Sequence, residues 1–581
     1  MFKDISSLKI VSWVKKNKRV LILFFVVLIV LYLGVVKVIA STKMSYYGDE
    51  SDDIAIVIKD LSSVKVFFNN VTSTDQARLQ NLIALPFVLI FKYNTLLSLR
   101  ILHIFLYFAY LFILYKLFSL KLSKVQAAYG IILVAFNAYM FSFSIFSAST
   151  SNTVANLLGT LLIYYYLDRF TTKNKPTLNN IILLGIIAGL AVGARFFNAI
   201  ILVSIFVYDI YLNRNLVIKD FKLNFWQNIL VRINCLFLFF LGVINLAPIR
   251  LTLKAPLAFL LVAFYIFFIL YEYKKNIIKI SEKKYLSFIE KWLALGTTSV
   301  VVSLIVSPIH LNFMNIYKLT KWSSLWHHNK NYINPSRFDI FTIIGIKLGV
   351  FVIVLTLLSI IFLIANKKLI QFLKDYALIL LIIVLNLAIF VWVKFVIVWY
   401  PLFIMPFLYL PLIYVFPKDL IKIRQPLIAI MLGILFLVPI MEQVRYWKLF
   451  PFGHIDGAQY GEEYIGWNKP GMITFESMNY VAKYFKENEH YLDSGSIDCK
   501  VVRSDIIFSD WAPRLINLIL SQQGASGFSC SNKYDELPSK YALTSVYTDS
   551  SSLAKINQDY KTIHLFNEAG VPFARLWVLK N

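Results

Sequence analysis

Charged residues are scarce in this sequence of 581 residues. Only 15% of the chain is Asp, Glu, Lys or Arg, whereas 59% is hydrophobic and 16% is aromatic. Ordinary soluble domains contain about 25% charged residues and about 45–50% apolar ones. The composition therefore excludes an ordinary soluble enzyme and indicates a membrane protein.

Acidic residues are the scarcest type in the first 441 residues, which contain 44 Lys and Arg but 16 Asp and Glu. The last 140 residues contain 14 basic and 16 acidic side chains, so the net charge of +26 belongs wholly to the hydrophobic part. Basic residues confined to gaps between apolar runs follow the topology rule of membrane proteins. We therefore do not interpret the charge as a nucleic-acid-binding surface.

Several sequence motifs are also missing. The chain has no Walker A loop, no GxGxxG motif and no internal repeat, so nothing indicates a nucleotide site. It has three cysteines, and no pair has the spacing of a zinc finger.

Apolar runs long enough to cross a hydrocarbon core of ~30 Å are, by contrast, abundant. We count about thirteen such runs on that length criterion. They are Arg19–Ala40, Leu97–Phe118, Gln126–Phe146, Thr153–Asp168, Asn180–Ala194, Phe197–Leu212, Ile233–Leu251, Pro256–Glu272, Trp292–His310, Ile340–Ala365, Tyr376–Val393, Trp399–Phe416 and Pro426–Met441.

Basic residues before the first run place the N-terminus in the cytoplasm. With the runs alternating from there, the cytoplasmic gaps hold 28 Lys and Arg and the outer gaps hold 14. The sequence thus predicts a polytopic α-helical membrane protein, in the plasma membrane, with everything after Met441 outside. The abundant Lys, Ile, Asn, Phe and Tyr suggest an AT-rich, most simply bacterial, genome and hence an inner membrane.

Residues 442–581 are expected to form a separate extracytoplasmic α/β domain. Patterns typical of helices and strands alternate there. The helices are expected at Met478–Asn488 and Ser551–Tyr560, and the strands at Asp505–Phe508, Tyr541–Val546 and Arg575–Leu579. Cys499 and Cys530 both fall in this domain, where a disulfide can form and persist, with two free buried thiols as the alternative.

Four acidic residues cluster immediately outside the first run, within residues 41–96: Asp49, Glu50, Asp52 and Asp53. Adjacent carboxylates raise each other's pKa and can supply a general base, or they can bind a hard cation. The alternative is a solvated acidic turn. On the residues alone, the two interpretations are about equally supported.

The Tyr-Gly-Asp-Glu segment after the first run, the long outer loop, the number of runs and the outer α/β domain together resemble the GT-C membrane glycosyltransferases. The group most similar contains the protein O-mannosyltransferases and lipid A aminoarabinose transferases (GT39/GT83-like). The resemblance implies a GT-C-like membrane domain over residues 1–441. It also implies an inverting transfer from a polyprenyl-phosphate sugar to a hydroxyl or phosphate of a lipid, glycan or protein on the outer face.

The same resemblance assigns candidate roles. It makes Asp49 the catalytic base, with Glu50 beside it. Basic and aromatic residues that would bind the donor phosphate are, by position, Lys65, Arg78, Arg195, Lys394 and Tyr400. Arg195 follows a Gly-Leu-Ala helix as in the family, and Lys394 and Tyr400 belong to a segment similar to its Arg-Tyr-x-x-Pro-x-x-Pro motif.

No cofactor is required by this scheme, although a divalent cation is compatible with it. The outer loop between the third and fourth runs carries no carboxylate, so a cation would be bound by Asp49, Glu50, Asp52 and Asp53. Two other classes of protein fit the same pattern. One is a polytopic transporter or flippase, and the other is a non-catalytic polysaccharide-assembly protein with the acidic segment as a docking surface.

Overall fold

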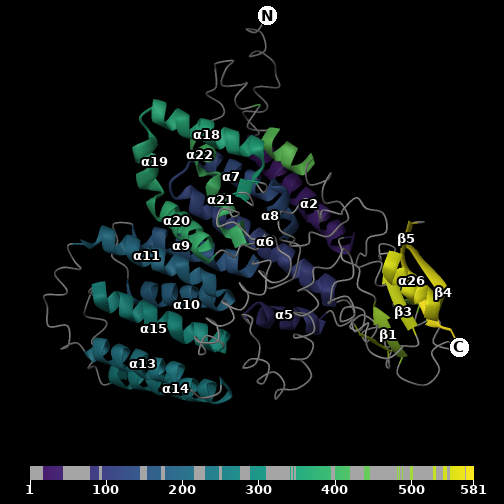
Figure 1. Cartoon of the computed structure of the whole chain (residues 1–581). Helices are drawn as coiled ribbons and strands as arrows, with labels where there is room; N and C mark the ends of the chain where they lie inside the picture. The colour runs from purple at the N-terminus through teal and green to yellow at the C-terminus, as the bar shows by residue number, and fades with distance from the viewer. Residues whose placement is uncertain are drawn as a thin grey trace, which may run out of the picture.

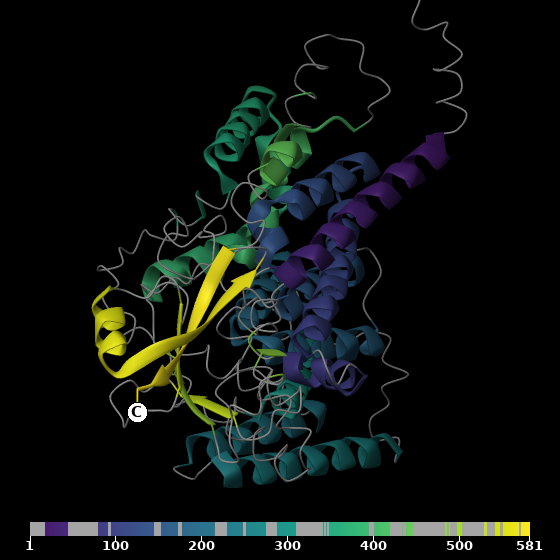
Figure 2. The same ribbon diagram turned by 90° about the vertical axis from the view of Figure 1, so that its right-hand side faces the viewer.

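The computed structural model contains a bundle of helices and, to one side of it, a small β-sheet (Figures 1 and 2). It describes residues 18–43, 79–90, 95–143, 153–171, 177–214, 229–247, 251–274, 288–308, 341, 344–345, 348–393, 400–418, 433, 437–444, 481, 483–484, 487, 497–501, 528–531, 541–545, 550–568 and 571–580.

Most helices of the first half of the bundle coincide with predicted apolar runs. Its helices are α2 (Lys18–Lys43), α5 (Leu79–Ile90), α6 (Thr95–Ser119), α7 (Lys124–Phe136), α8 (Ala138–Phe143), α9 (Thr153–Phe170), α10 (Leu178–Ala194), the 3-10 turn η3 (Phe196–Asn198) and α11 (Ala199–Leu212).

The second half continues with α13 (Ile229–Leu246), α14 (Leu251–Lys274), α15 (Phe288–Val306), α18 (Val350–Ala365), α19 (Leu369–Asp375), α20 (Ala377–Val393), the 3-10 turn η6 (Tyr400–Phe403), α21 (Met405–Leu408) and α22 (Leu410–Val415). Short and broken elements at the end of this series replace the continuous span expected at Trp399–Phe416. Prolines at 401, 406 and 411 explain the breaks, because proline lacks the N–H that a helix interior needs.

Two helices of the described part, Leu99–Ser119 and Phe288–Val306, are long and apolar enough to cross a membrane. The pair α18–α19 would make a third span if its 113° bend is disregarded. Shorter apolar helices lie at seven further positions, among them Leu178–Ala194 and Ala377–Val391. The thirteen-span topology and its orientation remain predictions.

The span expected at Gln126–Phe146 is two helices, α7 and α8, that meet at Asn137. Backbone groups released at this break have partners from distant segments, as an apolar environment requires. Glu442 Oε2 accepts from the N–H of Ala138 at 3.0 Å and from Asn137 Nδ2 at 3.1 Å. Gln443 Nε2 donates to the carbonyl of Phe136 at 3.0 Å, which ties residues 437–444 to the break.

Lys37, inside the first span, is fully buried. Its Nζ donates to the carbonyl of Phe141 at 2.7 Å and lies 4.3 Å from the ring centroid of Tyr107. Arg100, also fully buried, donates to the carbonyl of Ser41 at 2.7 Å. The two cations therefore fix the last turns of α2, ahead of the acidic segment of the sequence.

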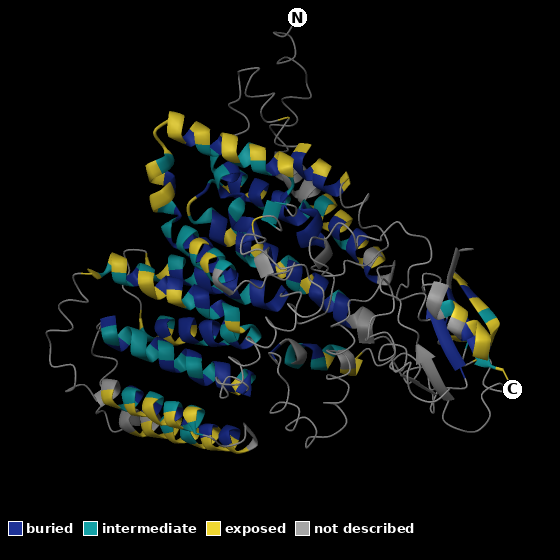
Figure 3. Cartoon of the chain, in the orientation of Figure 1, coloured by how far each residue is buried: buried dark blue, intermediate teal, exposed yellow. Residues whose placement is uncertain are grey.

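The bundle core surrounds α6, α7 and α9 and extends to α20–α22, whereas α13 and α14 pack in a smaller cluster with α15. Many apolar residues of α2, α13, α14 and α18 are exposed. Figure 3 shows exposed positions along these helices. Exposed apolar residues are expected where helices contact lipid.

The sheet has the strand order β2-β1-β3-β5-β4. Its members are β1 (Ile497–Val501), β2 (Phe528–Ser531), β3 (Tyr541–Ser545), β4 (Tyr560–Glu568) and β5 (Val571–Leu579), with helix α26 (Ser550–Asp559). Strands β1, β2 and β3 run parallel, and β5 pairs antiparallel with β3 and β4.

Three of the predicted elements of this domain are present, namely the strands at 541–546 and 575–579 and the helix at 551–560. Residues 481, 483, 484 and 487 are helical, as expected for Met478–Asn488, and Asp505–Phe508 lies outside the described residues. Strands β1, β2 and β4 were not predicted. Ile556, Tyr560 and Trp577 form the core between α26 and the sheet.

Candidate functional site

A pocket at one end of the bundle contains the one predicted site residue whose side chain the structure describes, Arg195. Helix α10 ends at Ala194, and Arg195 is its C-cap, with an extended backbone (φ −160°, ψ 127°). The break in the chain follows directly, because η3 intervenes before α11 begins. Arg195 therefore projects from a helix end, not from a helix flank.

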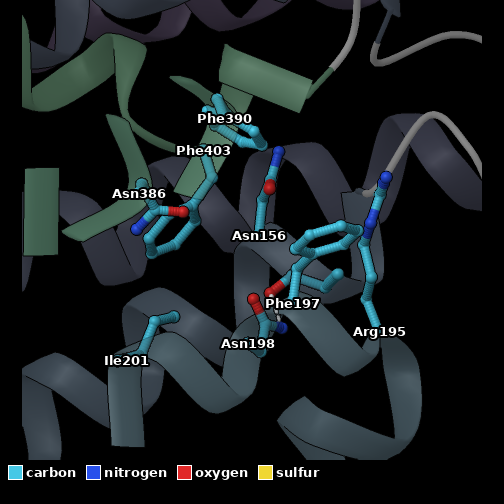
Figure 4. A pocket seen from close by; sticks show the side chains of 9 residues that line it. Asn156, Arg195, Phe197, Asn198, Ile201, Asn386, Phe390 and Phe403 are labelled. Carbon is cyan, nitrogen blue, oxygen red and sulfur yellow. Dashed lines mark hydrogen bonds between the residues drawn. The ribbon is translucent and has the colours of Figure 1, made fainter. Parts of the chain in front are cut away.

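The walls of the pocket come from four parts of the bundle (Figure 4). They are Ala155 and Asn156 of α9; Arg195, Phe197, Asn198 and Ile201 around η3; Asn386 and Phe390 of α20; and Phe403 of η6. The pocket thus joins segments that lie more than 200 residues apart in the sequence.

Asn198 holds the chain break in place. Its Nδ2 donates to the carbonyls of Ala155 at 3.0 Å and Ala191 at 2.9 Å. The carbonyl of Ala191 lies in the last turn of α10, where carbonyl groups run out of helical N–H partners. It accepts from the N–H of Arg195 and, in addition, from Asn198. Asn198 consequently links α9 and α10 at the base of the pocket.

Aromatic rings shape the rest of the site. The guanidinium carbon of Arg195 lies 5.5 Å from the ring centroid of Phe197, a distance at which cation–π attraction operates. Phe197 in turn contacts Phe390 with 6.3 Å between ring centroids. The arginine is half-buried and its Nη1 atom is buried, so its charge is partly desolvated.

Two further carboxamides face a mostly apolar environment. Asn156 and Asn386 are 7% and 6% exposed, and Asn386 Nδ2 donates to Ile382 O of its own helix at 2.8 Å. Burying a polar side chain in an apolar helix costs free energy, so such residues often have a function. This cost marks Asn156 and Asn386 as candidate site residues. The sequence interpretation missed Asn156, Asn198 and Asn386 because it considered only charged and aromatic residues here.

Chemically, the pocket combines one cation, three amides and three phenyl rings. An arginine can grip a phosphate through two parallel hydrogen bonds. The enclosed space is about 20 Å³, enough for about one water molecule. A phosphate group would therefore bind at the mouth of the pocket, beside Arg195.

Most other predicted site residues lie outside the described residues. They are Asp49, Glu50, Asp52, Asp53, Lys65, Arg78 and Lys394. Tyr400 is the first residue of η6, the element that contributes Phe403 to the pocket, and Lys394 directly follows α20. Within the part of the chain that the structure describes, no group of three His, Cys, Asp or Glu side chains could hold a metal ion.

Comparison with known proteins gives matches among solved structures but none among family models or curated proteins. The crystal structure of ArnT from Cupriavidus metallidurans in the apo state is similar over 95% of this chain and 97% of that chain. The sequence identity is 11% and the TM-score is 0.32, so the likeness is a coarse one.

Proposed function

We propose that the protein is a membrane glycosyltransferase that takes its sugar from a polyprenyl-phosphate donor, with Arg195 binding the donor phosphate. The pocket around Arg195 is the observation that carries this proposal. It offers a partly desolvated guanidinium, at a helix end, between polar amides and phenyl rings. An amphiphile with an anionic group and an apolar chain matches that combination.

In the proposed reaction, an acceptor oxygen attacks the anomeric carbon of the donor sugar. The bond from that carbon to the phosphate oxygen breaks, and the phosphate leaves with the electron pair. Asp49 takes the proton from the acceptor, with Glu50 beside it. Arg195 compensates the charge that develops on the leaving phosphate, which is the role that fixed cations perform best in a water-poor site.

The proposal is tested by transfer or hydrolysis assays with a panel of polyprenyl-phosphate sugars in nanodiscs. We expect Arg195→Gln to lower turnover by about 10²- to 10³-fold, as for the loss of one group that stabilises transition-state charge. Asp49→Asn should lower turnover by about 10²- to 10⁴-fold, as for the loss of a general base.

Arg169→Gln is the matched control. Arg169 lies in the last turn of α9, is 58% exposed and pairs with Asp168, so its loss should leave turnover unchanged. The proposal fails if Arg195→Gln and Arg169→Gln behave alike. It also fails if no donor turns over and Asp49→Asn complements a deletion strain, which would favour the transporter and assembly interpretations.

A further inference from the structure

The bend between α18 and α19 carries an exposed cationic surface that plays no part in the proposed reaction. The two helices meet at 113° through Asn366, Lys367 and Lys368, all three of them exposed. Figures 1 and 3 show this bend at a corner of the bundle, with exposed residues on both sides of it. We call residues 366–374 the elbow.

The elbow lies where a lipid-facing surface ends. Leu357, Ile361 and Ile364, on successive turns of α18, are 55%, 59% and 56% exposed. A row of exposed side chains as apolar as these is expected where a helix contacts lipid tails. The sequence becomes polar at Asn366, so the headgroup region of the membrane falls at the elbow.

Beyond the bend, α19 has the two-sided character of an interfacial helix. Phe372 is buried, with its ring centroid 5.2 Å from that of Tyr376 and 5.3 Å from that of Tyr414. Ile370 and Leu373 are 67% and 45% exposed. Apolar side chains exposed beside lysines are typical of helices that lie in the membrane surface.

The backbone at the bend is strained by a lysine. The N–H of Lys368 donates to Leu363 O at 2.9 Å and that of Lys367 to Ile364 O at 3.0 Å, which closes the end of α18. Lys367 has φ 57° in this closure, a position that glycine normally occupies because it has no Cβ. A lysine in this conformation costs backbone energy that a glycine would not.

Basic charge is concentrated at the same place. Lys367, Lys368 and Lys374 are exposed, as is Lys418 just after α22, the helix that packs against α18. No ion pair involves these four lysines among the residues that the structure describes. Asp375 accepts from Gln371 Nε2 at 3.0 Å.

We propose that the elbow is a binding site for the headgroups of anionic phospholipids. Lys367 and Lys368 bind the headgroup phosphate, Lys374 adds to the positive potential, and Ile370 and Leu373 insert among the acyl chains. The predicted topology puts the elbow in the cytoplasmic leaflet. This site does not depend on the proposed glycosyltransferase activity.

The experiment reconstitutes the full chain into nanodiscs that contain phosphatidylcholine and phosphatidylglycerol in equal amounts. Native mass spectrometry of the released protein then measures the ratio of the two retained lipids. A basic residue near an anionic surface is worth about fivefold in binding. We therefore expect Lys367→Gln with Lys368→Gln to lower the retained phosphatidylglycerol relative to phosphatidylcholine by at least fivefold.

A matched double variant, Lys121→Gln with Lys124→Gln, removes two exposed lysines from the turn between α6 and α7. This variant removes the same charge, and it should lower the lipid ratio by less than the elbow double variant does. Lys367→Gly supplies an independent test, because it relieves the strained backbone. It should unfold at the same or a higher temperature in neutral detergent and still retain less phosphatidylglycerol.

Three outcomes would overturn the inference. One is an unchanged lipid ratio in both elbow variants. A second is an equal loss in the Lys121 and Lys124 control, which would indicate a response to overall charge only. The third is a Lys367→Gly variant with full lipid retention, because the lysine side chain would then have no part in binding.

Discussion

The buried carboxylate of Asp209 shows how a single charge is accommodated in the bundle. Its side chain is 2% exposed and accepts from Tyr166 Oη at 2.9 Å, from Trp292 Nε1 at 2.6 Å and from Lys291 Nζ. These partners tie α9 and α15 to α11, at the end of α11 that is remote from the Arg195 pocket. A buried ion pair is tolerated when its hydrogen bonds are as complete as these.

Removing this carboxylate should be strongly destabilising. Asp209→Leu leaves the ammonium of Lys291, 13% exposed, without its partner, and breaking a buried pair in this way costs about 3–5 kcal/mol. Thermal unfolding in detergent should show a large fall in midpoint, most of which is recovered when Lys291→Met is added. Asp168→Asn, at an exposed pair, should cost at most about 1 kcal/mol. Equal shifts for the Asp209 and Asp168 variants would contradict this account.

The sequence made Arg195 a candidate site residue, which remains a prediction, whereas it gave no reason to single out Asp209. Arg195 follows a helix rich in glycine and alanine, and its position there, which resembles that of a basic residue in the GT-C glycosyltransferases, made it a candidate. Asp209 stands near the end of an apolar run, where a charge is unremarkable. Its partner Lys291 lies 82 residues away, and no spacing rule connects the two.

At the scale of elements, three glycines decide how α10 packs on α15. Gly185, Gly189 and Gly193 recur at every fourth position of α10, so they lie on one face of the helix. A Cβ built on Gly189 would lie 2.5 Å from the carbonyl oxygen of Ser299, and one on Gly193 would collide with Val306. Small residues at this spacing let two apolar helices approach closely.

Gly189→Ala should therefore weaken the contact between α10 and α15. The new methyl group meets backbone, which cannot move aside as a side chain would, and overpacking of this kind costs about 1–3 kcal/mol. Gly296→Ala on α15 is the matched control, because no atom lies within 4 Å of its added Cβ. The control should be neutral or slightly stabilising, since alanine favours helix over glycine. A Gly189→Ala variant with the wild-type unfolding midpoint would contradict the close packing of α10 on α15.

There is also a physical reason why some elements could be predicted from the sequence and others could not. The apolar runs that correspond to α6 and α15 were located within a few residues, because a long apolar composition is itself the signal of a helix that can cross lipid. The break at Asn137 was missed, since its compensating partners, Glu442 and Gln443, come from 300 residues further along. Strands β1 and β2 have five and four residues and are stabilised by pairing across the sheet, which the sequence does not show. Strand β4 has nine residues and begins at Tyr560, which was assigned to the preceding helix.

For the whole molecule, the register of two strands offers a test of the predicted topology. Cys499 and Cys530 are partners on the neighbouring parallel strands β1 and β2. Adjacent strands lie about 4.8 Å apart, within the range of Cα separations that a disulfide bridges, about 4.4–6.8 Å. The backbone spacing is thus compatible with the pairing that the sequence left open, and a disulfide can persist in an oxidising compartment.

We expect the disulfide to form, because an odd number of spans after a cytoplasmic N-terminus puts the sheet outside the membrane. Maleimide-polyethylene glycol added to denatured, acid-quenched cells should modify one thiol, Cys235, of the three cysteines, and all three after reduction. Cys499→Ser should expose Cys530 and give two adducts without reductant. Loss of the bond should also cost about 2–4 kcal/mol in stability. Three adducts in the unreduced wild type would instead indicate that the sheet lies in a reducing compartment. The number of spans before it would then be even. The sheet would lie on the opposite side of the membrane from the face on which the proposed transfer takes place.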